Sequence, residues 1–207
     1  MVIPLKRNAN RLINLALVSL ALVSCYVFVV ASLRSLGDQR PVTADDNIWL
    51  IAADQLAINN PDVSASLAYY QRQQAFYYES EQRQQLLRSS LNHWQKASAL
   101  RPLWPYYQLG ALDIEVILDQ PAAQIQSRIT WVISLTPNER GLDKSLLELA
   151  VFSWEKLTQG QKDWMLKRLK LLNHSELLFV LEAAEKVNKK ALLCAYLPFT
   201  KIRRYCR

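Results

Sequence analysis

Residues 90–102 read SLNHWQKASALRP, and residues 125–137, which follow at a spacing of 35, read IQSRITWVISLTP. Each stretch ends in a proline, which has no backbone N–H to donate and therefore stops a helix. Residues at fixed offsets before each proline share one helix face. The residues twelve, eight and five positions before each proline are small or apolar. They are Ser90, Trp94 and Ala97 in the first stretch, and Ile125, Ile129 and Val132 in the second. The two stretches therefore predict two amphipathic helices that pack on their neighbours in the same way.

This spacing is similar to that of tetratricopeptide (TPR) helix pairs, which repeat about every 34 residues and use small residues where the helices approach. Trp104, Leu109 and Gly110 do not keep the strict TPR offsets, so the likeness is to a degenerate repeat. The same spacing also arises in other arrays of helical hairpins. We expect an all-α protein whose residues 44–207 form a TPR-like array of helical hairpins.

Glycine is scarce, with 4 in 207 residues, where average usage gives about 14. Phosphate-cradling loops such as GxGxxG are absent, which excludes nucleotide binding of that kind. Tight turns of β-sandwiches and barrels rely on glycine, and no segment alternates with period two, so an all-β fold is excluded.

Caps and apolar periodicity predict further helices. We expect Thr43 to cap a helix that starts at residue 44, and Asp62 to cap the next helix. Residues 80–100 are expected to form a third helix. A capping box of Thr158 with Gln161 is expected to open a later helix, and residues 173–176 are expected to form a turn. Gly110 falls inside a predicted helix, where a small residue lets a neighbour approach.

Residues 12–33, LINLALVSLALVSCYVFVVASL, carry no charge over 22 positions. Such a helix is about 33 Å long, enough to cross a hydrocarbon core of about 30 Å. Three cations precede the run (Lys6, Arg7 and Arg11) and two follow it (Arg34 and Arg40). This excess favours a cytoplasmic N-terminus. We expect residues 1–11 in the cytoplasm, 12–33 as a single transmembrane anchor, 34–43 as a juxtamembrane linker and 44–207 as the exported domain.

Two alternatives to an uncleaved anchor remain open. Residues 29–31 offer small side chains for signal-peptide cleavage, although the apolar run exceeds the usual 7–15 residues. Residues 22–25, LVSC, resemble a lipobox with Cys25 as the lipidated residue, although the apolar YVFVV follows where a polar tether is expected.

The C-terminal third is basic and holds two cysteines. Residues 138–207 contain 14 Lys and Arg against 8 Asp and Glu, within a net charge of +7. From Lys186 onward there are seven cations and no acid. Such a tail suits anionic lipid, glycan or an acidic partner, or is a solvated helix end. Nucleic acid is not expected as a partner on the exported side. Since Cys25 lies in the apolar run, Cys194 and Cys206 are the pair that an oxidising compartment allows to form a disulfide.

Residues with the spacing of a catalytic or metal site are absent from the sequence. Neither His93 nor His174 has a His, Cys or carboxylate at i+3 or i+4, and HExxH and GxSxG are missing. Asp113 and Glu115, two residues apart on a helix, point to different faces. We therefore assign no catalytic residue, metal or cofactor and do not expect an enzyme.

Aromatic residues are the candidate binding side chains: Trp94, Trp104, Tyr106 and Tyr107 near two prolines, and Tyr77 and Tyr78 beside a glutamine-rich run. Rings stack on sugars while amides bind hydroxyls, so the set suits a glycan. Aromatic clusters are also typical of protein interfaces and of packing between helices.

Residues 97–107, ASALRPLWPYY, together with WEKL at residues 154–157, resemble the VpsP-type family of bacterial exopolysaccharide-biosynthesis proteins. The specific likeness covers residues 90–157. It implies one N-terminal membrane helix, a compact helical periplasmic region, and a part in polysaccharide production without a defined catalytic role. The resulting hypothesis is an inner-membrane accessory or scaffold protein whose partners are membrane-bound polysaccharide synthesis or export proteins. A glycan-binding module and a generic envelope-assembly scaffold are the alternatives.

Overall fold

The computed structural model describes residues 5–43, 45–137, 139–198, 200–201 and 206. Every regular element in this part of the chain is a helix, so the predicted all-α class is confirmed. The elements are α1 (Leu5–Asp38), α2 (Ile48–Leu56), α3 (Pro61–Gln74), η1 (Ala75–Tyr77), α4 (Ser80–Leu100), α5 (Pro105–Ile117), α6 (Ala122–Leu135), α7 (Asp143–Phe152), η2 (Trp154–Lys156), α8 (Gln159–Leu169), α9 (His174–Lys186) and α10 (Lys190–Ala195).

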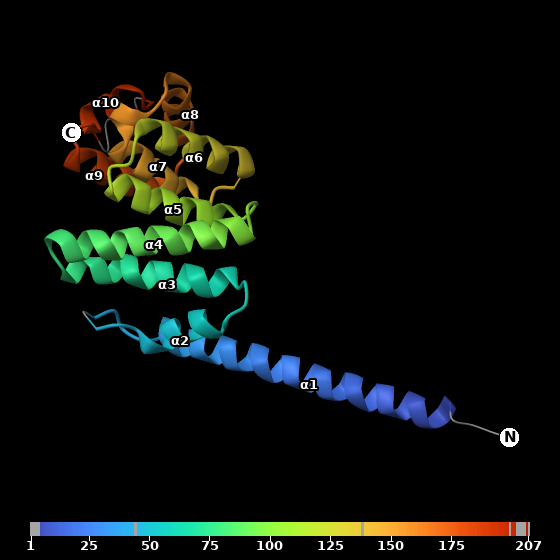
Figure 1. Ribbon diagram of the computed structural model, residues 1–207. Helices are drawn as coiled ribbons and strands as arrows, with labels where there is room; N and C mark the ends of the chain where they lie inside the picture. The colour runs from blue at the N-terminus through green and yellow to red at the C-terminus, as the bar shows by residue number, and fades with distance from the viewer. Residues whose placement is uncertain (1–4, 44, 138, 199, 202–205, 207) are drawn as a thin grey trace.

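The helices form a stack from which α1 projects (Figure 1). Along the chain, α2 packs on α1, α3 on α2, α4 on α3, α5 on α4 and α6 on α5, while α7 packs on α9. The connections α2–α3, α4–α5 and α6–α7 lie on one side of the stack, the side toward which the N-terminal half of α1 extends (Figure 1). We call this side the anchor-side edge.

Five of the six residues at the proline-referenced offsets lie in the core, and the sixth, Trp94, is partly buried against it. Ser90, Ala97, Ile125, Ile129 and Val132 are each at most 1% exposed. Their spacing places them on the helix faces that meet neighbouring helices, where burial of apolar surface stabilises the stack. The periodicity thus located the buried face of α4 and α6 correctly.

Gly110 on α5 permits a close approach between α5 and α4. A Cβ at this position would lie 2.5 Å from Cε2 of Trp94. The indole therefore occupies the space that any larger residue would need, as expected for a glycine inside a helix at a helix contact.

Two helices begin at other residues than expected. α2 starts at Ile48 and is capped by Asn47, whose side chain accepts a hydrogen bond from the Leu50 N–H, so the expected Thr43 cap is wrong. α3 is capped by Asn60 rather than by Asp62, which lies in its first turn. Asparagine is among the strongest N-caps, and proline after Asn60 suits the first helical position. Residue 44 lies outside the described part.

Two capping boxes fix later helix starts. Thr158 and Gln161 form the expected box at the start of α8. Asn173 and Glu176 form a second box at the start of α9, so the expected turn at residues 173–176 is the beginning of that helix.

α1 is the helix, among the described residues, that is long and apolar enough to cross a membrane. It continues to Asp38, so residues 34–38 are helical although we expected a linker there. Contacts with the stack explain the extension. Leu50 fills the space beside Gly37, Asn47 donates to the Gly37 carbonyl at 2.9 Å, and Val30 is 4% exposed.

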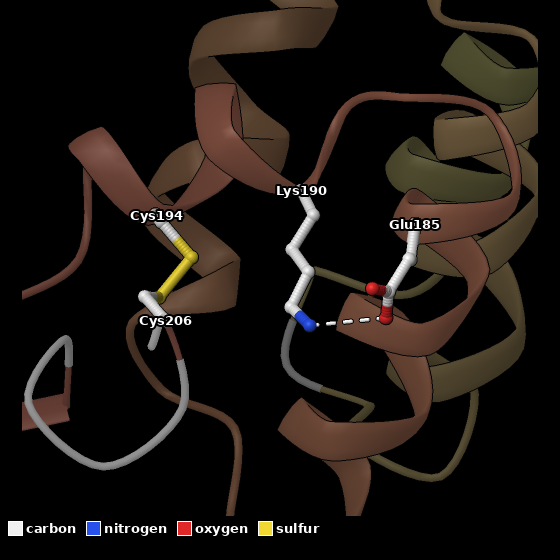
Figure 2. Close-up of a disulfide and its surroundings, with 4 residues drawn as sticks. All are labelled: Glu185, Lys190, Cys194 and Cys206. Carbon is white, nitrogen blue, oxygen red and sulfur yellow. Dashed lines mark hydrogen bonds and ion pairs between the residues drawn. A yellow bond between two sulfur atoms is a disulfide. The ribbon is translucent and has the colours of Figure 1, made fainter.

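The C-terminal segment is tied to the stack by a disulfide and by lysine contacts (Figure 2). Cys194 on α10 is bonded to Cys206, with their Cα atoms 5.9 Å apart. Lys190 on α10 pairs with Glu185 on α9 at 3.0 Å. Lys201 donates to the carbonyls of Lys170 and Leu172. The basic residues Arg203, Arg204 and Arg207 and the N-terminal residues 1–4 lie outside the described part.

Candidate functional site

A groove runs between α3, α5 and α7, with α4 contributing to its wall. It consists of two adjoining hollows of about 320 Å³ and 410 Å³ that share Arg72, Asp113, Glu148 and Leu149. We call it the α3–α5–α7 groove. Its lining residues are Tyr69, Arg72, Gln73, Phe76, Arg83, Trp94, Tyr106, Leu109, Gly110, Asp113, Val116, Ile117, Ser145, Glu148, Leu149 and Phe152.

An ion pair crosses the middle of the groove. Arg72 on α3 donates from Nε to Oδ2 of Asp113 on α5 at 2.7 Å, and from Nη2 to Oδ1 at 3.3 Å. Each side chain is 26% exposed. The guanidinium also lies 5.2 Å from the centre of the Phe76 ring. This two-point geometry holds α3 and α5 at a fixed spacing.

Glu148 on α7 faces the same space without such a partner. Its side chain makes no hydrogen bond or ion pair with the described residues. Burial raises the pKa of Glu148, and Asp113 raises it further, while Lys186, Lys144 and Arg72 oppose the shift. Because Arg72 is already engaged by Asp113, Glu148 is the group in the groove that is best placed to receive a hydrogen-bond donor or a cation from a ligand.

Two of the predicted aromatic residues, Trp94 and Tyr106, line the groove. Trp104 lies beside it, with its ring centre 5.6 Å from that of Tyr106. Tyr69, which lies beside the glutamine-rich run, lines the groove and is 58% exposed. The aromatic surface available to a ligand therefore consists of Tyr69, Tyr106, Phe76 and Phe152, with Trp94 between α4 and α5.

Tyr107 has a structural role instead. It is 5% exposed, and its hydroxyl donates to Asp62 on α3. Burial, together with the hydrogen bond to Asp62, raises the pKa of Tyr107 to about 12. Tyr106 and Tyr107 are neighbours on a helix and so face different directions, which separates the groove residue from the core residue.

Tyr77 and Tyr78 are not among the residues that line the groove. Tyr77 lies in η1 and donates to the Val42 carbonyl at 3.0 Å, which ties the segment before α2 to the end of α3. Tyr78 ends η1. Of the glutamine-rich run, Gln73 faces the groove, whereas Gln74 is 2% exposed and donates to Asp46.

The groove residues that sequence reasoning missed are Arg72 and Glu148, and it also missed the role of Asp113. Arg72 and Asp113 are 41 positions apart, and Glu148 comes from a third helix, so no local pattern links them. The signal that could have found them is the order of the helices, because the first helices of successive pairs in such stacks line one common face.

A further hollow of about 350 Å³ lies near Trp154 and Lys156. Its charged groups satisfy one another. Lys156 pairs with Asp119 at 2.5 Å, and Lys189 with Glu155, whose pKa is lowered by that hydrogen bond. These pairs leave less charge for a ligand than the α3–α5–α7 groove offers.

Neither histidine contributes to the groove lining. His93 on α4 is half-buried, and burial lowers its pKa, while Asp54 opposes and Lys96 adds to the shift. No group of three or more His, Cys, Asp or Glu side chains in the described part of the chain is placed to hold a metal ion.

Comparison with known proteins gives no match: no family model, curated protein or solved structure is similar to this chain.

Proposed function

We propose that this protein is a membrane-anchored scaffold that binds a segment of a partner protein in the α3–α5–α7 groove, and that it serves exopolysaccharide synthesis or export. The observation that carries the binding proposal is the groove itself. It combines exposed rings, an ion pair that fixes its width and one carboxyl group, that of Glu148, whose side chain has no ion-pair partner in the described part of the chain.

The order of the helices supports a TPR-like reading of the stack. In such arrays the first helix of each pair lines the concave, ligand-binding face. If α3 with α4 and α5 with α6 are two pairs and α7 opens the next, their first helices are α3, α5 and α7. These three helices supply most of the residues that line the groove, and α4 adds Arg83 and Trp94.

The groove also specifies the chemistry of the partner segment. Tyr69, Tyr106 and Leu109 favour apolar or aromatic side chains of the partner. A Lys or Arg of the partner placed beside Glu148 would pair with a carboxyl group that has no ion-pair partner among the described residues. The expected ligand is therefore an extended or helical peptide with apolar residues flanking one cation.

The anchoring part of the proposal rests on α1. The apolar run before Arg34 crosses the membrane once, with residues 1–11 in the cytoplasm and the stack in the periplasm. Cleavage after Ala31 would remove Val30, which packs with Ala53 and Val63, and Tyr26, which bonds to Leu56 and Ile58, so these contacts of α1 favour an uncleaved anchor. The link to exopolysaccharide comes from the family resemblance of residues 90–157.

Photo-crosslinking from full-length protein in native membranes tests the binding proposal. A photoreactive phenylalanine analogue at Tyr69 is expected to capture a membrane-bound polysaccharide synthesis or export protein. The same analogue at Tyr196, which directly follows α10, is 51% exposed and lies outside the groove, is the matched control. Equal capture from both positions contradicts the groove proposal. Unchanged polysaccharide output after deletion of the gene contradicts the assignment to that pathway.

Glycan binding is the second candidate, favoured by Gln73 lying with Tyr69 and Tyr106 in one hollow. Rings and an amide in such an arrangement can stack on a sugar and bind its hydroxyl groups. Calorimetric binding of a polysaccharide fragment that is lost in Tyr106→Ala but kept in Tyr196→Ala would favour this candidate over a peptide ligand.

A further inference from the structure

The anchor-side edge carries exposed apolar side chains from three separate parts of the chain. Ile58 in the α2–α3 connection is 78% exposed, and Leu103 and Trp104 in the α4–α5 connection are 70% and 48% exposed. Trp131 near the end of α6 is 43% exposed. Single exposed apolar residues are ordinary, but a group of them on one edge marks an interaction surface.

Contacts between these segments show that they lie together. Arg101 pairs with Asp62 at the start of α3 at 3.4 Å. The Trp131 indole N–H donates to the Pro102 carbonyl at 3.4 Å. Arg101 and Ile58 line one hollow together with Tyr26 of α1. The edge is therefore continuous from α1 through the α2–α3 and α4–α5 connections to α6.

The docking of α1 sets the distance between this edge and a bilayer. The Tyr26 hydroxyl accepts from the Ile58 N–H at 2.8 Å and donates to the Leu56 carbonyl at 3.0 Å. Ile58 therefore lies at the level of Tyr26 along α1. Between Arg11 and Tyr26 stand the 14 uncharged residues 12–25, which as a helix span about 21 Å.

This length falls short of the hydrocarbon core, which is about 30 Å thick. With Arg11 at one headgroup layer, the opposite boundary of the core falls between Tyr26 and Leu33, within the α1 segment that packs on the stack. Ile58, at the level of Tyr26, thereby lies on the acyl-chain side of this boundary and within about 10 Å of it. The anchor-side edge is brought to the zone where headgroups meet acyl chains.

We propose that the anchor-side edge is a bilayer-contacting surface, and that its occupant is the leaflet on the stack's side of the membrane. Ile58 and Leu103 enter the boundary between headgroups and acyl chains. Trp104 and Trp131 take the interfacial position that indoles favour, and Arg101, which is half exposed, reaches lipid phosphates. This inference rests on the proposed anchoring by α1 and is independent of what binds the groove.

The composition of the edge suits this depth rather than the middle of the bilayer. Asn59, Asn60 and Asp62 stand beside Ile58, and Asn60 caps α3 by accepting from the Asp62 and Val63 N–H groups. Polar groups of this kind are tolerated among headgroups but not in hydrocarbon. The helices α3, α4 and α5 run roughly along the direction of α1 and follow one another sideways from it (Figure 1). With α1 across the bilayer, these helices are therefore set side by side along the membrane surface.

Spin labels on single cysteines test this proposal in full-length protein reconstituted into vesicles of phosphatidylcholine and phosphatidylglycerol. In a Cys25→Ser background, Ile58→Cys and Leu103→Cys each place a label on the edge. Glu79→Cys is the control, since Glu79 is exposed and lies on the opposite side, between η1 and α4. The measurement is the accessibility of each label to oxygen relative to a water-soluble nickel chelate.

We expect this ratio to be several-fold higher at positions 58 and 103 than at position 79. Equal ratios at the three positions overturn the proposal. Spin–spin broadening at 58 or 103 that disappears on dilution with unlabelled protein also overturns it, because a second copy would then cover the edge. A label at Val18→Cys reports on the anchor separately: if it is exposed to nickel, the anchoring itself is wrong, whereas a protected Val18→Cys with exposed edge labels refutes this inference alone.

Discussion

Arg128 on α6 donates to both carboxylate oxygens of Glu115 on α5, from Nε to Oε2 and from Nη2 to Oε1, each at 2.7 Å. The Glu115 side chain is fully buried. Gln124 donates to the same carboxylate at 2.9 Å, and Arg128 donates to Gln108 at 2.6 Å. A buried carboxylate satisfied in this way fixes how α5 lies on α6, and α5 forms one wall of the groove.

Arg128→Met is expected to lower the free energy of unfolding by about 3 kcal/mol, because Glu115 is left as a buried charge without its cation. Chemical denaturation of the detergent-solubilised protein, followed by circular dichroism, measures the change. Ser127→Ala alters an exposed neighbour on the same helix and is the control. A variant as stable as this control would show that the ion pair contributes little.

Gly110→Ala is expected to destabilise the protein by about 1–3 kcal/mol through overpacking. Alanine is a better helix former than glycine by about 1 kcal/mol, so a loss of stability must come from the contact with Trp94. Gly160→Ala on α8 is a matched control, since a Cβ there meets nothing within 4 Å. Thermal unfolding of both variants separates the two effects, and a Gly110→Ala protein at least as stable as Gly160→Ala would refute the contact.

Loss of the Cys194–Cys206 disulfide is expected to lower stability by about 3 kcal/mol in the chain-entropy model, for cysteines separated by 12 positions. The double variant Cys194→Ser with Cys206→Ser should melt at a lower temperature than the oxidised wild type. Reductant should move the wild type toward the variant and leave the variant unchanged. Equal melting of oxidised and reduced wild type would mean that the bond does not constrain the native protein.

Glu148 gives stability a defined dependence on pH. Burial raises its pKa, so the folded state keeps a proton that the unfolded chain releases. The contribution of Glu148 to the free energy of unfolding is fully present below the ordinary carboxyl pKa. It is lost as pH rises through the raised pKa that Glu148 has in the folded protein. Glu148→Gln cannot ionise, so its stability relative to wild type is expected to increase as pH rises above about 4.3 and then to level off.

Denaturation of wild type and Glu148→Gln across this pH range measures the difference. Ser145→Ala, which alters another groove residue without removing a titratable group, should differ from wild type by a constant amount. A constant difference for Glu148→Gln as well would contradict the raised pKa.

The sequence predicted those features that depend on local pattern. Residues 80–100 are α4 as expected, and Thr158 with Gln161 caps α8, because periodicity and capping chemistry act within a few residues. The start of α2 was missed because Thr43 and Asn47 are both acceptable caps. The choice between them depends on the Gly37 carbonyl, which Asn47 reaches only after α2 has packed on α1.

The groove could not be predicted from the sequence for a related reason, since its lining depends on how the helices pack. Trp94 and Tyr106 were found because aromatic residues are conspicuous, but Tyr107 was grouped with them although it lies in the core. Which of two adjacent tyrosines faces a ligand depends on the rotation of α5, and that rotation is set by contacts of Gly110, Asp113 and Glu115 with other helices.

The hydrogen bonds of Tyr26 and the helical continuation of α1 to Asp38 leave no hinge between the proposed anchor and the stack. A protein tethered in this way meets its partners by lateral and rotational diffusion in the plane of the membrane. Its stack stays at one distance from the bilayer and at one tilt to it. The groove then follows α5 from Tyr106, next to the anchor-side edge, outward to Ile117. A partner chain that emerges from the bilayer would meet the end of the groove at Tyr106 first. The length of α5 would then set how far from the membrane a partner segment must extend to fill the groove.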